Sequence, residues 1–198
     1  MPTGVAIRDV REQLFGAAER VLLRAGPNAL TSRAVTAEAG CAKGVLHKHF
    51  TDFDAFLAEF VLDRIARLDE GTAALRDAAG TGTVADNLME ALTALFASTA
   101  LALVGLIAAR DELRARLRRD LPAGVPVLTE AAELIAAYLA AERDLGRVAP
   151  GADVDTLAAM LIGTTHLRHA GHGDTPPAPD TVRRIVTAVL ATAAPPAG

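Results

Sequence analysis

The stretch AGCAKGVLHKHF, from Ala39 to Phe50, decides how the rest of this sequence is interpreted. Gly40 separates two short segments of helical pattern, which together describe a helix-turn-helix. In that motif the second helix enters the major groove and the first lies across the phosphate backbone. A metal site is the alternative, because the stretch also holds a cysteine and two histidines. Residues two apart on a helix point about 200° away from each other, so a shared ion at His47 and His49 would require distortion.

Both short helices offer polar groups to DNA. Thr31 or Ser32 can cap the first, and the second runs from about Ala42 to His49. Lys43 and Lys48 are expected to contact phosphate, whereas the small or polar residues between them face base edges. The expected DNA-binding residues are Thr31, Ser32, Arg33, Lys43, Gly44, Val45, His47, Lys48 and His49.

The remainder of the chain shows helical spacing of apolar residues and no sustained alternation of the kind that predicts strands. Breaks at glycine and proline separate the expected helices. These are 7–24, 53–71, 84–99, 100–121 with a break, 125–145, 153–170 and 179–194, with a link of small residues at 71–82. The sequence therefore predicts an all-α chain, with a three-helix domain over 1–52 and a larger helical domain over 53–198.

Composition and charge narrow the class of protein. Residues 1–50 carry seven Lys or Arg against four acids, whereas the other 148 residues carry 13 against 20. A basic end on an acidic body predicts that only the N-terminal part meets a polyanion. The apolar stretch 91–109 contains threonine, serine and glycine, so it is interpreted as a buried helix and no membrane is expected. One cysteine and no N-terminal signal pattern favour a cytoplasmic protein.

Residues of about 8–65 resemble the TetR family of bacterial transcriptional regulators. The family pattern reads roughly AA-x-x-L-F-x-x-x-G, then a second helix, then AGVSKGTLYRHF. The matching residues are Ala17-Ala18, Leu22-Leu23, Gly26, Arg33, Val35, Ala39-Gly40, Lys43-Gly44, Leu46 and His49-Phe50. The chain departs from the pattern at three positions that contact DNA in the family: Ala42 replaces a serine, His47 a tyrosine, and Phe53 a lysine.

The resemblance implies a homodimeric transcriptional repressor that binds a double-stranded DNA operator and is released by a small apolar ligand. It also implies that the last two helices pair with those of a second subunit. The expected interface residues form the apolar stripes of these helices: Val154, Leu157, Leu161, Val182, Ile185, Val186, Val189 and Leu190. An ordinary intramolecular core is the alternative explanation of the same stripes.

The larger domain is expected to enclose the ligand, because its helices carry many small residues and few large aromatic ones. An uncharged or weakly acidic ligand of modest size is predicted, since no basic cluster lies on the inner faces. The candidate ligand-binding residues are Phe96, Thr99, Leu103, Tyr138, Met160, Thr164 and His166. A plain core is the alternative for each of them.

Other chemistry finds little support in the sequence. His166, His169 and His172 could hold a metal, but a positively charged helix end or pocket lining explains them better, and no metal or cofactor is expected. The run 110–120 has mixed charges at helical spacing, which favours a solvated face over a second polyanion site. No catalytic constellation is present, so an enzyme is not expected. A helical small-molecule-binding protein that has lost DNA binding is the rival hypothesis, motivated by the three departures.

Overall fold

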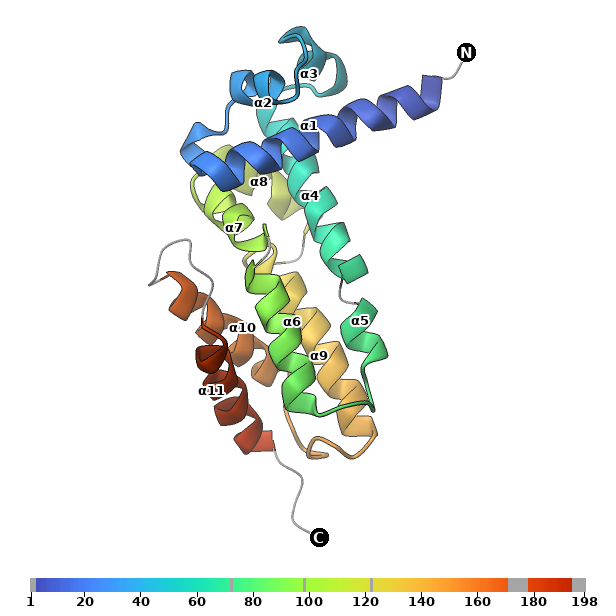
Figure 1. Ribbon diagram of the computed structural model, residues 1–198, viewed down its shortest axis with the longest axis vertical. Coiled ribbons are helices and arrows are strands. Elements are labelled where there is room, and N and C mark those ends of the chain that lie inside the picture. The colour runs from blue at the N-terminus through green and yellow to red at the C-terminus, as the bar shows by residue number, and fades with distance from the viewer. Residues whose placement is uncertain (1–2, 72, 98, 122, 171–177, 194–198) are drawn as a thin grey trace. The chain divides into compact units, whose positions relative to one another are not determined.

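The computed structural model describes residues 3–71, 73–97, 99–121, 123–170 and 178–193, and every regular element within these ranges is helical (Figure 1). The chain divides into two compact units. Unit 1 comprises Met1–Arg64 with Thr99–Pro126, and unit 2 comprises Ile65–Ser98 with Val127–Gly198. The division differs from the predicted boundary after residue 52, because a later helical hairpin packs with the N-terminal helices.

Unit 1 holds the predicted three-helix motif and that hairpin. Its helices are α1 (Thr3–Ala25), α2 (Ser32–Glu38), α3 (Gly44–His49), the first part of α4 (Phe53–Gly71), α7 (Ala100–Ala108) and α8 (Asp111–Asp120). A single 3-10 turn, η1 (Pro27–Ala29), follows α1 and packs against α7. Gly26 permits this turn, since its φ of 75° is one that residues with a side chain rarely adopt.

Phenylalanines form the core of unit 1. The ring of Phe56 has no exposed surface, and the centroids of Phe15 and Phe50 lie 5.7 and 5.0 Å from it. Phe53 and Phe60 stack on the same ring from either side along α4, at 5.6 and 6.4 Å. Five of the six phenylalanines of the chain are therefore concentrated where α1, α3 and α4 meet.

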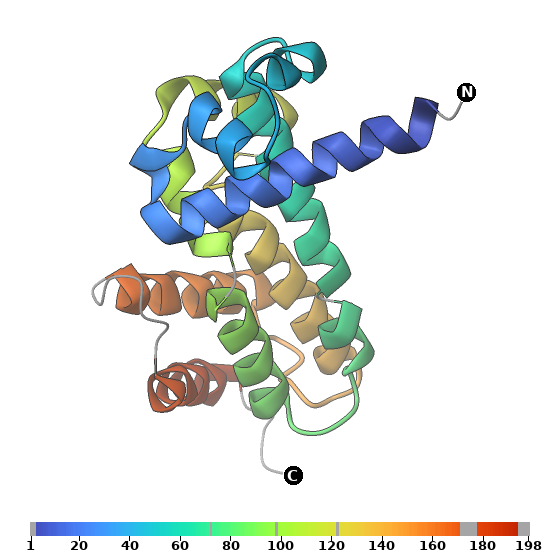
Figure 2. The ribbon, with the colours of Figure 1, turned by 45° about the horizontal axis from the view of Figure 1, so that its top comes forward.

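Unit 2 contains the end of α4 together with α5 (Ala73–Asp77), α6 (Val84–Ala97), α9 (Leu128–Asp144), α10 (Val154–Ala170) and α11 (Pro179–Leu190). A 3-10 turn, η2 (Ala191–Ala193), extends α11. Within this unit α10 packs on α9, and α11 packs on both α6 and α10 (Figures 1 and 2). The predicted link over 71–82 is partly wrong, because α5 occupies the middle of it.

A buried polar cluster ties the turn after α5 to α9. The carboxylate of Glu142 has no exposed surface, accepts from the Gly80 N–H at 3.3 Å, and faces Arg147 Nε at 3.3 Å. The hydroxyl of Tyr138 contacts the same carboxylate and accepts from Asn87 Nδ2 at 2.9 Å. Burial, first, and the neighbouring Glu142 raise the pKa of Tyr138 to about 12, so this tyrosine stays neutral and donates to the carboxylate.

No single helix in the described ranges is long and apolar enough to cross a membrane. By length and composition alone, α6 and α7 reach that threshold when taken together across the break between them. Six of their larger apolar side chains are buried within the protein: Leu88, Leu92 and Phe96 on α6, and Leu103, Leu106 and Ile107 on α7.

Candidate nucleic-acid interface and internal pocket

The turn between α2 and α3 has the geometry that the sequence predicts. Thr31 caps α2, since its side-chain oxygen accepts from the Ala34 N–H at 3.1 Å. Gly40 ends the helix with a φ of 65°, and the Cys41 N–H then donates back to the Thr36 carbonyl at 3.0 Å. These bonds close the turn tightly, so α3 follows α2 after five residues.

The helix α3 is short and anchored by two side chains. Leu46 is completely buried, and Phe50, which ends the helix, is 4% exposed. The helix begins at Gly44 and not at Ala42, and no side chain caps it. The absent cap agrees with the departure at Ala42, where the TetR pattern has a serine. The position of α3 therefore depends on the buried side chains of Leu46 and Phe50 and on hydrogen bonds from α1.

Two side chains of α1 donate hydrogen bonds to the backbone of the helix-turn-helix motif. Gln13 donates to the Ala39 carbonyl at 2.8 Å, at the end of α2. Arg11 donates to the His49 carbonyl at 3.1 Å, at the end of α3. The Arg11 guanidinium also lies 4.6 Å from the centre of the Phe50 ring and pairs with Glu59 on α4. Both short helices are thus fixed at their C-terminal ends by α1.

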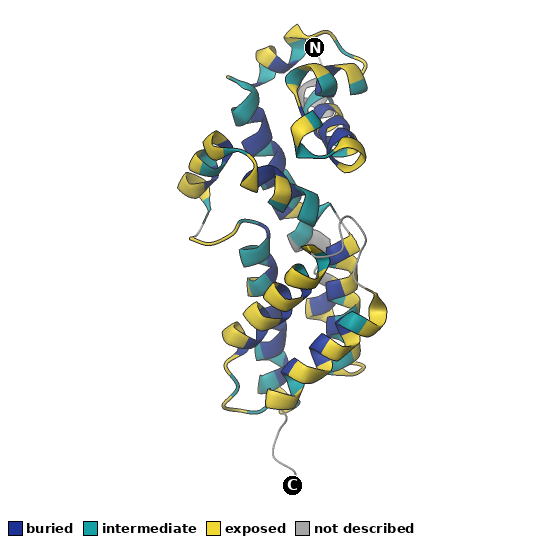
Figure 3. Ribbon diagram, turned by 90° about the vertical axis from the view of Figure 1, so that its left-hand side faces the viewer, coloured by how far each residue is buried: buried dark blue, intermediate teal, exposed yellow. Residues whose placement is uncertain are grey.

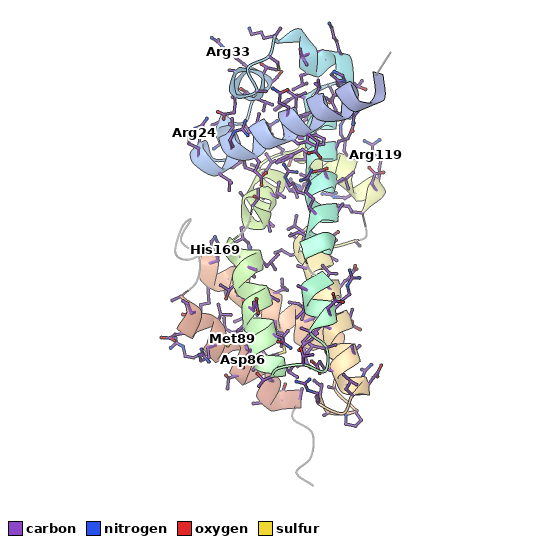
Figure 4. All side chains as sticks on the ribbon, turned by 45° about the vertical axis from the view of Figure 1, so that its right-hand side comes forward. Arg24, Arg33, Asp86, Met89, Arg119 and His169 are labelled. Atoms are coloured by element: carbon purple, nitrogen blue, oxygen red, sulfur yellow. The ribbon has the colours of Figure 1, made fainter. Side chains whose placement is uncertain are left out.

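The outer side of the motif presents the residues that the sequence assigns to DNA. Gly44, His47 and Lys48 on α3 are exposed, and so is Lys43 directly before it. Val45 and His49 are half-buried, because they border the anchored face. At the start of α2, Thr31 and Arg33 are exposed and Ser32 is half-buried; Figure 4 labels Arg33 on α2. The structure brings the nine predicted residues together around α2 and α3.

The cations of this region fall into two groups. Arg20 and Arg24 of α1 both donate to Glu38 at 2.8 Å, and these bonds lower the pKa of that carboxyl. Arg33, Lys43 and Lys48, in contrast, have no ion pair within the described part of the chain. Their charges remain available to an external anion. The free positive charge of the motif is therefore carried by α2 and the start and end of α3.

The comparisons with known proteins agree with this geometry. Residues 14–60 match the family model described as bacterial regulatory proteins, tetR family. This segment is therefore similar to the N-terminal domain of that family. The matched segment runs from Leu14 on α1 to Phe60 on α4 and includes both short helices. No curated protein matches the chain.

Solved TetR-like structures share the fold over nearly the whole chain. A TetR-family transcriptional regulator from Agrobacterium tumefaciens is 15% identical, with a TM-score of 0.68 over 95% of this chain and 99% of that one. NemR of E. coli in its reduced form is also 15% identical, with a TM-score of 0.71 over the same shares. FadR of Bacillus subtilis, in complex with stearoyl-CoA, is 16% identical, with a TM-score of 0.66 over 90% and 97%.

A pocket of about 390 Å³ lies within unit 2, between the end of α4, α5 and α6. Its volume falls in the range of small-molecule sites. Alanine and leucine form most of its wall, and one arginine and one glutamate are its charged residues. The lining consists of Arg67, Leu68, Ala74, Leu75, Ala78, Asn87, Glu90, Ala91, Ala94 and Leu95. None of the seven ligand-binding residues predicted from the sequence belongs to this set.

Those predicted residues are distributed elsewhere. Phe96 and Tyr138 are buried in unit 2, where the Tyr138 hydroxyl is engaged by Asn87 and Glu142. Thr99 and Leu103 belong to unit 1, and Thr99 donates to Glu19 of α1. Met160 and Thr164 lie on the exposed face of α10, and His166 is half-buried near its end.

The residues of the predicted dimer interface lie on α10 and α11. Seven of its eight residues are buried within the chain itself: Val154, Leu157, Leu161, Val182, Ile185, Val186 and Val189. Leu190 is half-buried. The apolar stripes of α10 and α11 pack within unit 2, chiefly against α9 and α6 (Figure 3). In the single chain they therefore contribute to the intramolecular core, which is the alternative explanation that the sequence allows.

The histidine group near the end of α10 lies only partly within the described residues. Among the described residues, no group of three or more His, Cys, Asp or Glu side chains could hold a metal ion. His166 and His169 lie on α10, with the His169 ring 6.3 Å from that of Phe96. His172 lies outside the described residues.

Proposed function

We propose that this TetR-family transcriptional regulator is a homodimeric repressor, and that a small apolar ligand bound in unit 2 releases it from DNA. One observation carries the DNA-binding part of the proposal. Arg33 on α2, Lys43 directly before α3 and Lys48 on α3 have no ion pair among the described residues. The helix α3 itself presents exposed residues on one side and is anchored by buried Leu46 on the other. Phosphate contacts at both ends position a helix, and the small or polar residues between them are free to meet base edges.

DNA binding is tested with fragments from the region upstream of the gene of this protein. Fluorescence anisotropy is expected to show tight, salt-dependent binding to one fragment and weak binding to unrelated DNA. Reduced transcription from that fragment in the presence of the protein would support a repressor, and increased transcription would contradict that part. If the protein binds no DNA but still binds apolar molecules, the rival hypothesis of a small-molecule carrier is supported instead.

We infer that the second subunit packs on the exposed face of α10. One α3 helix reads few bases, so a two-fold dimer is needed to read two half-sites. This face carries two of the large apolar side chains that the described residues leave in solvent, Met160 (43% exposed) and Leu167 (72% exposed). Gly163 and Thr164, both exposed, lie between them at helical spacing and permit close approach of another helix.

Leu167→Glu is expected to yield monomers in sedimentation velocity and to weaken DNA binding, because it buries an unpaired charge in the interface. Leu145→Glu is the matched control, since Leu145 is 57% exposed at the end of α9, away from this face. A dimer that persists in Leu167→Glu would contradict the assignment of the face. Val186→Glu is unsuitable for this purpose, because Val186 is fully buried and the variant would unfold the chain.

The ligand is proposed to be uncharged or weakly acidic and to occupy the pocket lined by α4, α5 and α6. Arg67 and Glu90 offset each other in charge, and both are exposed, so the pocket wall offers no basic cluster for a multiply charged anion. The stearoyl-CoA of the B. subtilis FadR complex carries several phosphates. The lining of the pocket in this chain favours an apolar ligand without phosphate groups. Release requires that the ligand bind the non-DNA-binding conformation more tightly.

A thermal-shift screen of apolar compounds tests the ligand. Hits should raise the melting temperature and lower DNA affinity, and Ala91→Phe should abolish both effects by filling the pocket. Thr93→Phe is the control, because Thr93 lies on the exposed side of α6 and outside the lining. If only polyanions stabilise the protein, or if Ala91→Phe responds normally, the pocket assignment is wrong.

A further inference from the structure

Two arginines of the α7–α8 hairpin contact the helix-turn-helix from outside the family-matched segment. Arg110, directly before α8, donates to the Leu30 carbonyl at 2.8 Å and pairs with Asp54 at 3.3 Å. Its guanidinium also lies 5.3 Å from the centre of the Phe53 ring. One side chain thus joins the segment before α2 to the first turn of α4.

Arg116, in the middle of α8, makes the second contact. Its Nη2 lies 2.6 Å from Asp52 Oδ2. The other oxygen of Asp52 accepts from the Ala55 N–H at 2.8 Å, which caps α4. The backbone bond from Ala55 and the Arg116 pair both lower the pKa of Asp52, so the carboxylate is charged at neutral pH and holds both partners.

These contacts lie directly before α2 and shortly after α3. Leu30 is fully buried and directly precedes Thr31, the cap of α2. Asp52 follows Phe50, where α3 ends, by two residues. The bonds from α1 fix the C-terminal ends of α2 and α3, whereas the arginines fix the chain where it enters and leaves the motif. Without them the two short helices would be attached to the rest of unit 1 chiefly through α1 and the phenylalanine core.

We propose that Arg110 and Arg116 are positioning residues for DNA recognition, which set the orientation of α2 and α3 without contacting DNA. This inference rests on the proposed DNA-binding function. It assigns a role to the charged run 110–120, for which the sequence predicts only a solvated face. Arg118 and Arg119, in the last turn of α8, remain exposed and have no ion pair among the described residues, so they serve as internal controls.

The test measures DNA affinity and its salt dependence for Arg110→Gln, Arg116→Gln and the controls Arg118→Gln and Arg119→Gln. Loss of one partly exposed pair is expected to weaken binding about two- to fivefold per subunit, and hence up to about 25-fold in a complex of two subunits. The slope of affinity against salt should stay unchanged, because no phosphate contact is lost. The two controls should bind like the wild type.

A double-mutant cycle separates positioning from a general loss of stability. Asp52→Asn removes the charge but keeps a good cap for α4, so it should weaken binding as Arg116→Gln does. The double variant should bind no more weakly than either single variant, because both remove the same contact. Circular dichroism at the assay temperature establishes that each variant is folded.

Wild-type affinity in Arg110→Gln and Arg116→Gln would overturn the inference, and so would an additive cycle. A salt slope reduced by about one unit per subunit would overturn it as well, because it would mean direct phosphate contact. An equal loss in the controls would also overturn it, by showing that charge alone matters. Failure of the wild type to bind any DNA would contradict the proposed function itself. Normal wild-type binding with unaffected variants contradicts only the positioning role.

Discussion

Replacement of Lys48 by alanine isolates the electrostatic part of the DNA interface. Lys48 is exposed near the end of α3 and has no ion pair among the described residues, so the substitution breaks no contact within the protein. Stability should therefore change by no more than about 0.5 kcal/mol. Any loss of DNA affinity can then be attributed to the contact with DNA.

The magnitude follows from counterion release. Each phosphate contact contributes about 0.9 to the slope of log affinity against log salt, so two subunits together lose about 1.8. Between 50 and 200 mM salt the logarithm of the concentration changes by about 0.6. The ratio of wild-type to Lys48→Ala affinity should therefore shrink by about tenfold over this interval. The loss should be similar on the operator and on unrelated sequences.

Fluorescence anisotropy titrations at four salt concentrations measure both quantities. Arg24→Ala is the matched control, because it removes one positive charge from the same unit, but a charge that is paired with Glu38 at 2.8 Å. Its slope should equal that of the wild type. An unchanged slope in Lys48→Ala, a loss confined to one base position, or an equal effect of Arg24→Ala would refute the reasoning.

Three further predictions concern stability, each measured by urea unfolding. Phe56→Ala should cost about 3–5 kcal/mol and abolish DNA binding, because it opens a cavity in the middle of the phenylalanine core of unit 1. Glu142→Gln should cost about 1.5–3 kcal/mol through the lost charged bonds of a buried carboxylate, whereas the exposed Glu133→Gln on the same helix should be near neutral. Because the folded-state pKa of Tyr138 is raised to about 12 from an unfolded value near 10, its stabilisation is complete below pH 10 and is lost as the pH rises toward 12. The unfolding free energy of Tyr138→Phe should therefore fall less between pH 10 and 12 than that of the wild type. If both proteins show the same pH dependence of the unfolding free energy, this prediction is wrong.

The DNA-binding motif could be predicted from the sequence because its signals are local. Thr31 caps α2, Gly40 adopts a positive φ in the turn that follows α2, and Leu46 and Phe50 anchor α3 at fixed spacing. Each signal depends on residues only a few positions away, so a single chain suffices to detect it. The residues that face outward then follow from the helical period.

The surfaces of α10 and α11 could not be assigned in the same way. Val154, Leu157 and Leu161 form an apolar stripe on α10, but Met160 and Leu167 form a second one on the opposite side. Periodicity shows that a helix has apolar faces, and it does not show which face is covered by the same chain. That distinction depends on contacts with α6 and α9, which come from distant parts of the sequence.

The abundance of alanine makes both α5 and the pocket difficult to predict from the sequence. The many small residues around α5 predict a link, although alanine is the best helix former. The pocket wall contains four alanines, which have no functional group that would mark a binding site in the sequence: Ala74, Ala78, Ala91 and Ala94. Space between helices results from side chains that are too small to fill it, and a sequence does not show which small residues face each other.

The two units differ in how their interiors are filled, and the difference bears on regulation. Unit 1 holds five phenylalanines, four of them around the ring of Phe56. Unit 2 has only Phe96 and Tyr138 as its Phe, Tyr or Trp residues and leaves a pocket of about 390 Å³. Aromatic rings supply large buried area and fix a single arrangement, which suits a unit that must present α3 in one orientation. A wall of alanine and leucine leaves contacts unmade, so a ligand in the pocket supplies stabilisation that the side chains do not. We therefore expect ligand binding to raise the unfolding free energy of unit 2 directly.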